Sequence, residues 1–119
     1  MVHGSPNDYT YGRVYPDSDL SIFDCNQYNY IFMGNTHRPF IRNHNNVNFI
    51  NVGSCGLPRD HGHYGSAAIF DPNLGKCEII RFDIQTIITE IEAKYPDIHQ
   101  SVKNLFKRKS DSIYGDLVC

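Results

Sequence analysis

Histidine, asparagine and arginine side chains gather in three glycine-containing segments, at residues 3–6, 34–39 and 51–59. The second and third segments directly follow the strands predicted at 30–33 and 47–50. Loops at the carboxyl ends of strands converge on a crevice in open α/β sheets, so their side chains can meet there. Asn35 and His37 would point the same way in an extended loop and could grip one ion or an ion pair. Each segment is a weak signal by itself, and the combination indicates a site with metal-ligand chemistry.

The strands that must position these loops follow from the spacing of apolar residues. Residues 30–33 form a continuous apolar run that ends at Gly34, which predicts a buried strand. Two hairpins are predicted after it, because alternating or apolar runs flank turn-forming residues. Their strands fall at 39–42, 47–52, 66–71 and 77–82. Ahead of these strands, the segment 3–19 has the composition of a loop, and residues 20–27 predict a short helix capped by Asp17, Ser18 or Asp19.

The C-terminal third changes to helical periodicity. Apolar residues between 84 and 95 recur at spacings of three and four, which predicts an amphipathic helix that Pro96 stops. A second short helix, capped by Asp97, ends in the basic run 107–109, where the helix dipole favours cations. This run is interpreted as a solvated helix end in preference to an anion site. The whole pattern predicts a single domain over residues 1–119, of the α+β or layered α/β class.

Composition excludes several classes of protein. The chain has 11 Lys and Arg against 13 Asp and Glu, a formal net charge of −2. Nucleic-acid binders that neutralise phosphates usually carry a clear basic excess, so this balance disfavours them. No apolar run is long enough for a membrane helix, and the N-terminus does not resemble a signal peptide. The four cysteines lack metal-ribbon spacing and are expected to be reduced and mostly buried, with Cys119 exposed to oxidation. These features predict a cytoplasmic protein.

The three segments, taken in order, resemble the closing motifs of the calcineurin-like metallophosphoesterases, especially the small bacterial and archaeal phosphodiesterase branch. In that family the motifs run HG, then a strand into GHTH, then NPGS followed by G and PR. The same series here is His3-Gly4, a strand into Gly34-Asn-Thr-His37, and Asn51-Val-Gly-Ser-Cys-Gly-Leu-Pro-Arg59. The resemblance covers residues 1 to about 84 and leaves 85–119 as a helical C-terminal segment. It implies half of a four-layered αββα sandwich, a mixed sheet with hairpins and C-terminal helices.

The resemblance also implies a site for two divalent ions, which activate a water molecule that attacks phosphorus. His3, Asn35 and His37 would be the metal ligands, and Asn35 and His37 the catalytic residues. Asn35 stands where the family usually has a histidine, and its carbonyl oxygen is a harder, weaker ligand than an imidazole. The ions would be Mn, Fe, Zn or Ni, and the substrates phosphomonoesters or phosphodiesters. Arg38 and Arg59 would bind the phosphate, although hydrogen bonding within the loops explains them equally well.

The family's opening motifs, DxH, GDxxD and GNH, do not occur in this sequence. The chain therefore resembles the C-terminal half of such an enzyme, as a gene fragment or as one part of a split protein. One hypothesis is a phosphoesterase whose first half is supplied by a partner. The alternative is a catalytically inactive remnant that acts as an interaction or regulatory module. Self-association through exposed strand edges is also open, because an incomplete sheet leaves unpaired edges.

Several other residues suggest chemistry but have simpler explanations. The pair His61 and His63 could bind a metal, and a solvated loop is the preferred interpretation. The tyrosine-rich segment 8–15 could stack on a nucleobase, and packing of a loop on the sheet is preferred because basic residues are few. His44 in a hairpin turn and His99 in the second helix are expected to be surface histidines.

Overall fold

The computed structural model describes residues 1–118, and Cys119, predicted to be exposed, lies outside the described residues. A first, mixed sheet has the strand order β1-β3-β2. Its strands are β1 (Tyr30–Met33), β2 (Phe40–His44) and β3 (Val47–Asn51). Strand β1 pairs with β3 in parallel, and β2 pairs with β3 as an antiparallel hairpin. The predicted buried strand and the first predicted hairpin are thus confirmed.

The turn between β2 and β3 explains why this hairpin forms. Asn45 and Asn46 both adopt positive φ angles, 50° and 63°. Two consecutive left-handed residues are the signature of a two-residue hairpin turn whose twist matches that of the strands, and asparagine tolerates this conformation better than most residues. The segment Asn43-His-Asn-Asn46 is therefore a turn signal, as the sequence predicts.

A second mixed sheet is built around the second hairpin, with the order β4-β5-β6. Its strands are β4 (Tyr64–Asp71), β5 (Lys76–Asp83) and β6 (Asp116–Val118). The hairpin prediction is confirmed, with β4 starting slightly earlier than expected. Strand β6, which pairs in parallel with β5, was not predicted. Its three residues are all exposed, so it lacks the apolar pattern by which strands are recognised in a sequence.

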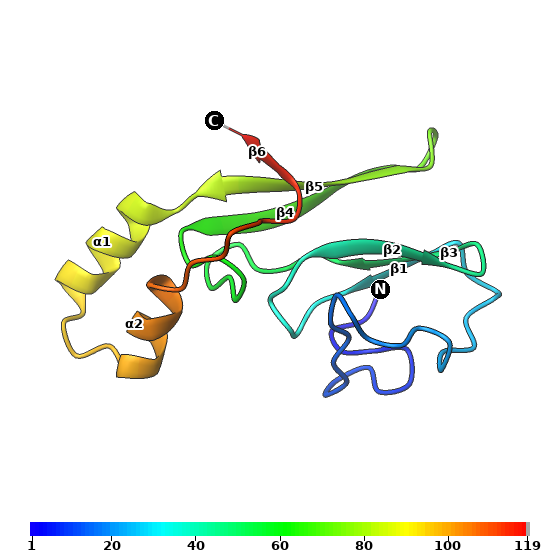
Figure 1. Cartoon of the computed structure of the whole chain (residues 1–119), viewed down its shortest axis with the longest axis horizontal. Helices are drawn as coiled ribbons and strands as arrows, with labels where there is room; N and C mark the ends of the chain where they lie inside the picture. The colour runs from blue at the N-terminus through cyan, green and yellow to red at the C-terminus, as the bar shows by residue number, and fades with distance from the viewer. Residues whose placement is uncertain (119) are drawn as a thin grey trace.

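The two sheets lie face to face as adjacent layers (Figure 1). The ring of Phe70 on β4 packs between those of Tyr30 and Phe32 on β1, with centroid distances of 4.8 and 5.3 Å. The Tyr30 hydroxyl also donates a hydrogen bond of 2.8 Å to the carbonyl of Gly75, in the turn of the second hairpin. Aromatic contacts between strands far apart in the sequence thus join the two layers.

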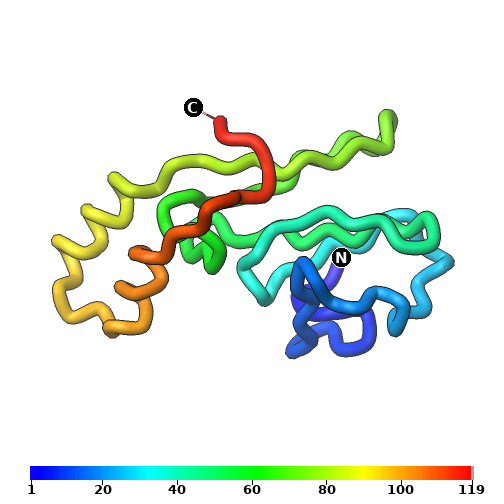
Figure 2. The backbone as a smooth tube through the Cα atoms, viewed as in Figure 1, coloured from blue at the N-terminus to red at the C-terminus, as the bar shows by residue number. Residues whose placement is uncertain are grey.

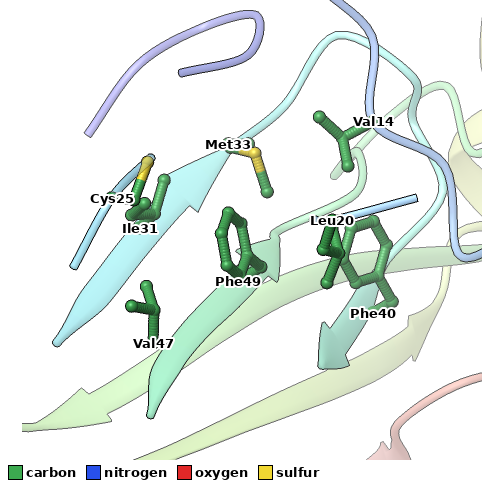
Figure 3. Close-up of a cluster of buried hydrophobic side chains, with 8 residues drawn as sticks. All are labelled: Val14, Leu20, Cys25, Ile31, Met33, Phe40, Val47 and Phe49. Carbon is green, nitrogen blue, oxygen red and sulfur yellow. The ribbon is translucent and has the colours of Figure 1, made fainter. Parts of the chain in front are cut away.

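The opposite face of the first sheet carries the main core (Figure 3). The irregular segment before β1 folds across this face and contributes Val14, Leu20 and Cys25. They pack against five side chains of the sheet: Ile31, Met33, Phe40, Val47 and Phe49. The helix predicted at 20–27 is wrong, because these residues form turns in which Asp19 accepts hydrogen bonds from Ser21. Buried Leu20 and Cys25 fix the segment on the sheet without a regular helix.

Two helices follow β5 and lie at one end of the second sheet (Figure 1). They are α1 (Gln85–Lys94) and α2 (Gln100–Phe106). Ile84, Ile88 and Phe106 form a second, smaller cluster there. The predicted cap of the second helix is wrong: His99 is the N-cap, and its ring accepts a hydrogen bond from the Ser101 backbone. After α2 the chain returns along the second sheet to form β6 (Figure 2).

The molecule is therefore a mixed α+β fold with two small mixed sheets and two helices, as predicted. Neither helix within residues 1–118 has the length and hydrophobicity that crossing a lipid bilayer requires. The three described cysteines are free thiols; Cys25 is buried and Cys77 half-buried, but Cys55 is exposed, against the expectation of mostly buried thiols.

Candidate functional site

The loop between β1 and β2 holds His37 in an unusual backbone conformation. His37 and Asn35 have φ angles of 57° and 63°, a left-handed region that costs a non-glycine residue energy and persists where surrounding contacts impose it. The Nδ1 atom of His37 lies 2.8 Å from the carbonyl oxygen of Leu57. Because a carbonyl can only accept, Nδ1 carries the proton and Nε2 of the neutral ring is left with a free lone pair. This arrangement orients an imidazole as metal-binding histidines usually are.

Asn35 has different partners from His37. Its side-chain amide donates to the carbonyls of Gly12 and Tyr11, at 2.8 and 3.3 Å. The loop is thus not extended, and the expectation that the two side chains point the same way because of an extended backbone is wrong. The amide oxygen of Asn35 is the atom that could ligate a cation, because the nitrogen is committed to the segment before β1.

His3 is brought beside this loop through its backbone. The carbonyl of His3 accepts a hydrogen bond of 3.0 Å from Gly34, and Val2 donates one of 2.9 Å to Phe32. Residues 2–3 therefore run along the outer edge of β1, next to the Gly34–His37 loop. A Cβ atom on Gly34 would lie 4.0 Å from Nδ1 of His3, so the imidazole of His3 is close to the loop. The HG and GNTH segments are neighbours in space, as their motif order predicts.

Asn51, at the end of β3, joins these loops and was not recognised as a site residue from the sequence. Its fully buried amide nitrogen donates to the Gly34 carbonyl at 2.8 Å and to the hydroxyl of buried Thr36 at 3.0 Å. Its amide oxygen accepts from the Gly53 backbone at 3.0 Å. One side chain thus fixes the second and third segments together. The position of Asn51 in the strand could have identified it. Asn51 lies on the same face of β3 as the buried Val47 and Phe49, where a polar side chain needs hydrogen-bond partners.

The third segment is held against His37 by its backbone. The amide of Arg59 donates to the carbonyl of His37 at 3.0 Å, while the Arg59 side chain is exposed. The Ser54 hydroxyl accepts a hydrogen bond from the Leu57 amide. The Ser66 hydroxyl on β4 accepts one from the Ser54 amide and donates one to the Val52 carbonyl. Arg38, half-buried, directly follows His37. The two arginines predicted to bind phosphate are therefore both backbone neighbours of His37.

A buried ion pair supports the end of the third segment and was also missed. Arg81 on β5 is fully buried and forms a two-pronged pair with Asp60, with N–O distances of 2.6 and 3.0 Å. Its guanidinium also donates to three carbonyls, those of Tyr64, Gly65 and Tyr114. Asp60 follows Arg59, so this pair anchors the loop that carries Arg59.

His61 and His63 lie beyond this ion pair. Their rings are 5.6 Å apart, and the ring of His61 also packs against Tyr64 at 4.8 Å. Burial lowers the pKa of His61 from its ordinary value, and the nearby positive charges of His63, Arg81 and Lys109 add to the shift. The His61 ring therefore favours its neutral form. Both residues are half-buried.

The residues present fit a metal ion in part. His37 has the orientation of a ligand, Asn35 belongs to the same loop and His3 lies beside Gly34, but the described chain contains no group of three or more His, Cys, Asp or Glu residues that could hold an ion. A catalytic metal site needs several anionic or imidazole ligands. The described residues of these segments therefore do not form a complete metal site by themselves.

Comparison with known proteins finds one matching family and structures with similar folds. The sequence profile described as the calcineurin-like phosphoesterase superfamily domain matches residues 1–74. Among solved structures, a hypothetical protein from Pyrococcus horikoshii aligns over 93% of this chain with a TM-score of 0.73 and 20% identity. A metallophosphoesterase from Sphaerobacter thermophilus aligns over 88%, with a TM-score of 0.68 and 23% identity. No curated protein sequence matches the chain significantly.

At these identities the two structures show a shared fold and no more. The chain covers 46% and 53% of their lengths, so it spans about half of each. The profile match covers the three segments and both hairpin strands of the first sheet, which is more than half of the described residues. The chain belongs to the calcineurin-like phosphoesterase superfamily.

Proposed function

We propose that this chain provides one side of the active site of a metal-dependent phosphoesterase that hydrolyses phosphomonoesters or phosphodiesters. The observation that carries the proposal is the hydrogen bond from Nδ1 of His37 to Leu57, which leaves Nε2 free to bind a cation. Divalent ions in such a site stabilise the charge on the phosphate oxygens and lower the pKa of a bound water. Mn, Fe, Zn and Ni all suit imidazole ligands.

Each predicted residue has a place in this proposal. His37 and His3 would hold the ions by their imidazoles, and Asn35 would ligate weakly or orient the substrate through its amide oxygen. Arg38 and Arg59 would bind the phosphate, because guanidinium groups recognise phosphate oxygens with paired hydrogen bonds. The strained loop supports this assignment, since left-handed asparagine and histidine cluster where function requires a fixed geometry.

The remaining ligands would come from a complementary half of the same fold. The chain spans about half the length of the two structures it resembles, and the described residues lack a complete ligand set. That half would be a segment of the same polypeptide or a separate chain, and it would add carboxylates and at least one more histidine. A cytoplasmic location is part of the proposal, supported by three free thiols.

The same two observations favour a second candidate, an inactive remnant that serves as an interaction or regulatory module. A ligand set that cannot hold two ions predicts little or no catalysis by this chain alone. The two candidates differ in what a complementary half would do: it restores hydrolysis in the first and does not in the second.

The test begins with metal binding. Isothermal titration of the metal-free chain with MnCl₂ or ZnCl₂ should detect weak binding that His37→Ala abolishes. His44→Ala removes a histidine on β2 that bonds only a neighbouring asparagine among the described residues, so it should bind like the wild type. Equal binding by wild type and His37→Ala would refute the assignment of His37 as a ligand.

Hydrolysis is then measured with bis-p-nitrophenyl phosphate and Mn²⁺. The chain alone should give no turnover, and addition of a polypeptide carrying the DxH, GDxxD and GNH motifs should restore it. Turnover by the purified chain alone would contradict the need for a second half. Stable assembly without turnover would favour the inactive module.

A further inference from the structure

The basic run at the end of α2 lies against the third segment. The Arg108 side chain donates a hydrogen bond of 2.6 Å to the carbonyl of Arg59, and the Arg108 carbonyl accepts one of 2.9 Å from Gly62. The contact is close, because a Cβ atom on Gly62 would lie 2.3 Å from the carbonyl oxygens of Leu105 and Phe106. Arg108 therefore docks the end of α2 on the loop at 59–62, while Lys107, Arg108 and Lys109 all stay exposed, as expected of a solvated helix end.

This docking makes the basic run continuous with the candidate site. The Arg59 amide is bonded to the His37 carbonyl and the Arg59 carbonyl to the Arg108 side chain, so hydrogen bonds lead from His37 through Arg59 to Arg108. We define the basic rim as the four cationic residues Arg59, Lys107, Arg108 and Lys109. All four are exposed. The run 107–109, which follows α2 and is distant from His37 in the sequence, therefore lies close to the His37 loop in the fold.

The charge of the basic rim is not cancelled by the acid next to it. Asp60, which follows Arg59, is bound on both oxygens by the buried Arg81. The side chains of Arg59, Lys107 and Lys109 have no hydrogen-bond or ion-pair partner within residues 1–118. The acid next in sequence, Asp111, is exposed on the segment that follows. A chain with a net charge of −2 therefore carries a local positive surface beside the proposed metal site.

We propose that the basic rim binds a second phosphate group of the substrate, so that the preferred substrates are small molecules with two or more phosphates, such as nucleoside polyphosphates. This inference rests on the proposed function, since it supplies the group beyond the reacting phosphate. A guanidinium and two ammonium groups that lack protein partners are suited to phosphate oxygens. A small-molecule ligand is favoured over nucleic acid because the rim is short and the rest of the chain is acidic.

The experiment measures anion binding without metal or turnover. The chain is titrated calorimetrically with sodium tripolyphosphate and with inorganic phosphate, in EDTA and at low ionic strength. The variant Arg59→Gln/Lys107→Gln/Lys109→Gln removes three charges and keeps Arg108, which anchors the run. The control Arg13→Gln/Lys76→Gln/Lys94→Gln removes three exposed charges outside the basic rim.

Tripolyphosphate should bind the wild type about tenfold more tightly than phosphate, and the rim variant should lose about tenfold in affinity, as three exposed charge contacts would give. The control should change less than about twofold, and added salt should weaken binding. Equal binding by wild type and rim variant, or no saturable binding of tripolyphosphate, would overturn the proposal. A 20-nucleotide single-stranded DNA that displaces tripolyphosphate at lower concentration would overturn the small-molecule assignment.

Metal binding and tripolyphosphate binding test the proposed function and the basic rim independently of each other. His37→Ala should bind tripolyphosphate like the wild type, because the rim and not the imidazole holds the anion. Failure of the wild type to bind metal, with its tripolyphosphate binding intact, would discard the phosphoesterase site alone. Failure of the wild type to bind tripolyphosphate, with its metal binding intact, would discard the rim alone.

Discussion

The two layers of the molecule are stabilised in different ways. The first sheet packs a continuous apolar core, and the buried polar group at the end of β3, Asn51, is a neutral amide with every hydrogen-bonding atom paired. The second sheet and its helices bury only a small apolar cluster and depend on a charged group, Arg81. The candidate metal ligands belong to the first layer and the basic rim belongs to the second. Removing each layer's central polar group should therefore disturb a different part of the site.

The largest effect is expected from Arg81→Met, which leaves Asp60 without its partner and three carbonyls without a donor. Loss of one member of a buried ion pair should lower the free energy of unfolding by about 3–5 kcal/mol. Urea denaturation followed by circular dichroism measures the change. Arg42→Met is the control in the first layer, where the side chain is half-buried and makes one hydrogen bond, to Ser18.

The proposed difference between the layers would be contradicted if the free energy of unfolding fell by more than about 3 kcal/mol in the Arg42 variant, or by less than about 1 kcal/mol in the Arg81 variant. If Arg81→Met does not fold, Asp60→Asn provides the milder test, because it removes the negative charge of the half-buried Asp60 and retains the side-chain shape.

Asn51→Ala should have the next largest effect. It leaves the Gly34 carbonyl, the Thr36 hydroxyl and the Gly53 amide without their shared partner in a buried site. The free energy of unfolding should fall by about 2–3 kcal/mol, the cost of unsatisfied buried polar groups. Thermal denaturation measures it. Asn48→Ala on the same strand is the control, because Asn48 is half-exposed. An equal decrease in the free energy of unfolding in both variants would show that the buried hydrogen bonds of Asn51 do not stabilise the fold more than those of a half-exposed asparagine.

Gly62→Ala tests the docking of α2 on the third segment. The added Cβ would meet backbone carbonyls of Leu105 and Phe106, which cannot move without shifting the helix. We expect a loss of about 1–3 kcal/mol, typical of overpacking, with faster amide exchange in α2 and unchanged exchange in the first sheet. Gly56→Ala is the matched control, since nothing lies within 4 Å of a Cβ there. Exchange that rises equally in both layers would contradict their separation.

The smallest effect is a pH dependence from His61. Burial lowers the pKa of His61 below its ordinary value of 6.5, so the unfolded chain takes up this proton before the folded chain does. Folding stability should therefore fall as the pH drops below about 6.5, and His61→Gln should flatten that part of the curve. Chemical denaturation between pH 7.5 and 5 measures it, with His44→Gln as the control. A wild-type slope that survives in His61→Gln would assign the effect to another group.

Much of the strand structure could be predicted because hydrophobic spacing encodes it directly. Residues 30–33 and both hairpins were recognised from apolar runs and turn residues, and the left-handed Asn45 and Asn46 explain why the first turn works. The failures have physical causes. Residues 20–27 carry apolar side chains that the sheet buries without a helix, and β6 has exposed residues that carry no pattern.

The sequence also placed the three segments in their correct neighbourhood, but the partners of their side chains could not be inferred. A left-handed loop turns Asn35 toward Gly12 and His37 toward Leu57, and this orientation depends on contacts with residues far away in the chain. Asn51 and Arg81 occupy positions on the apolar faces of β3 and β5. The alternation of apolar and polar residues along these strands therefore predicts that both are buried polar groups in need of hydrogen-bond partners.

The sequence by itself determined the strands, the turns and the order of the histidine- and arginine-bearing segments, because these depend on local conformation and on alternation along the chain. Only the tertiary structure decided which nitrogen of His37 is free, which groups Asn51 joins, and that the basic run 107–109 docks beside Arg59. Those outcomes depend on hydrogen bonds between residues widely separated in sequence, and such bonds form only when the two layers and the helices have packed.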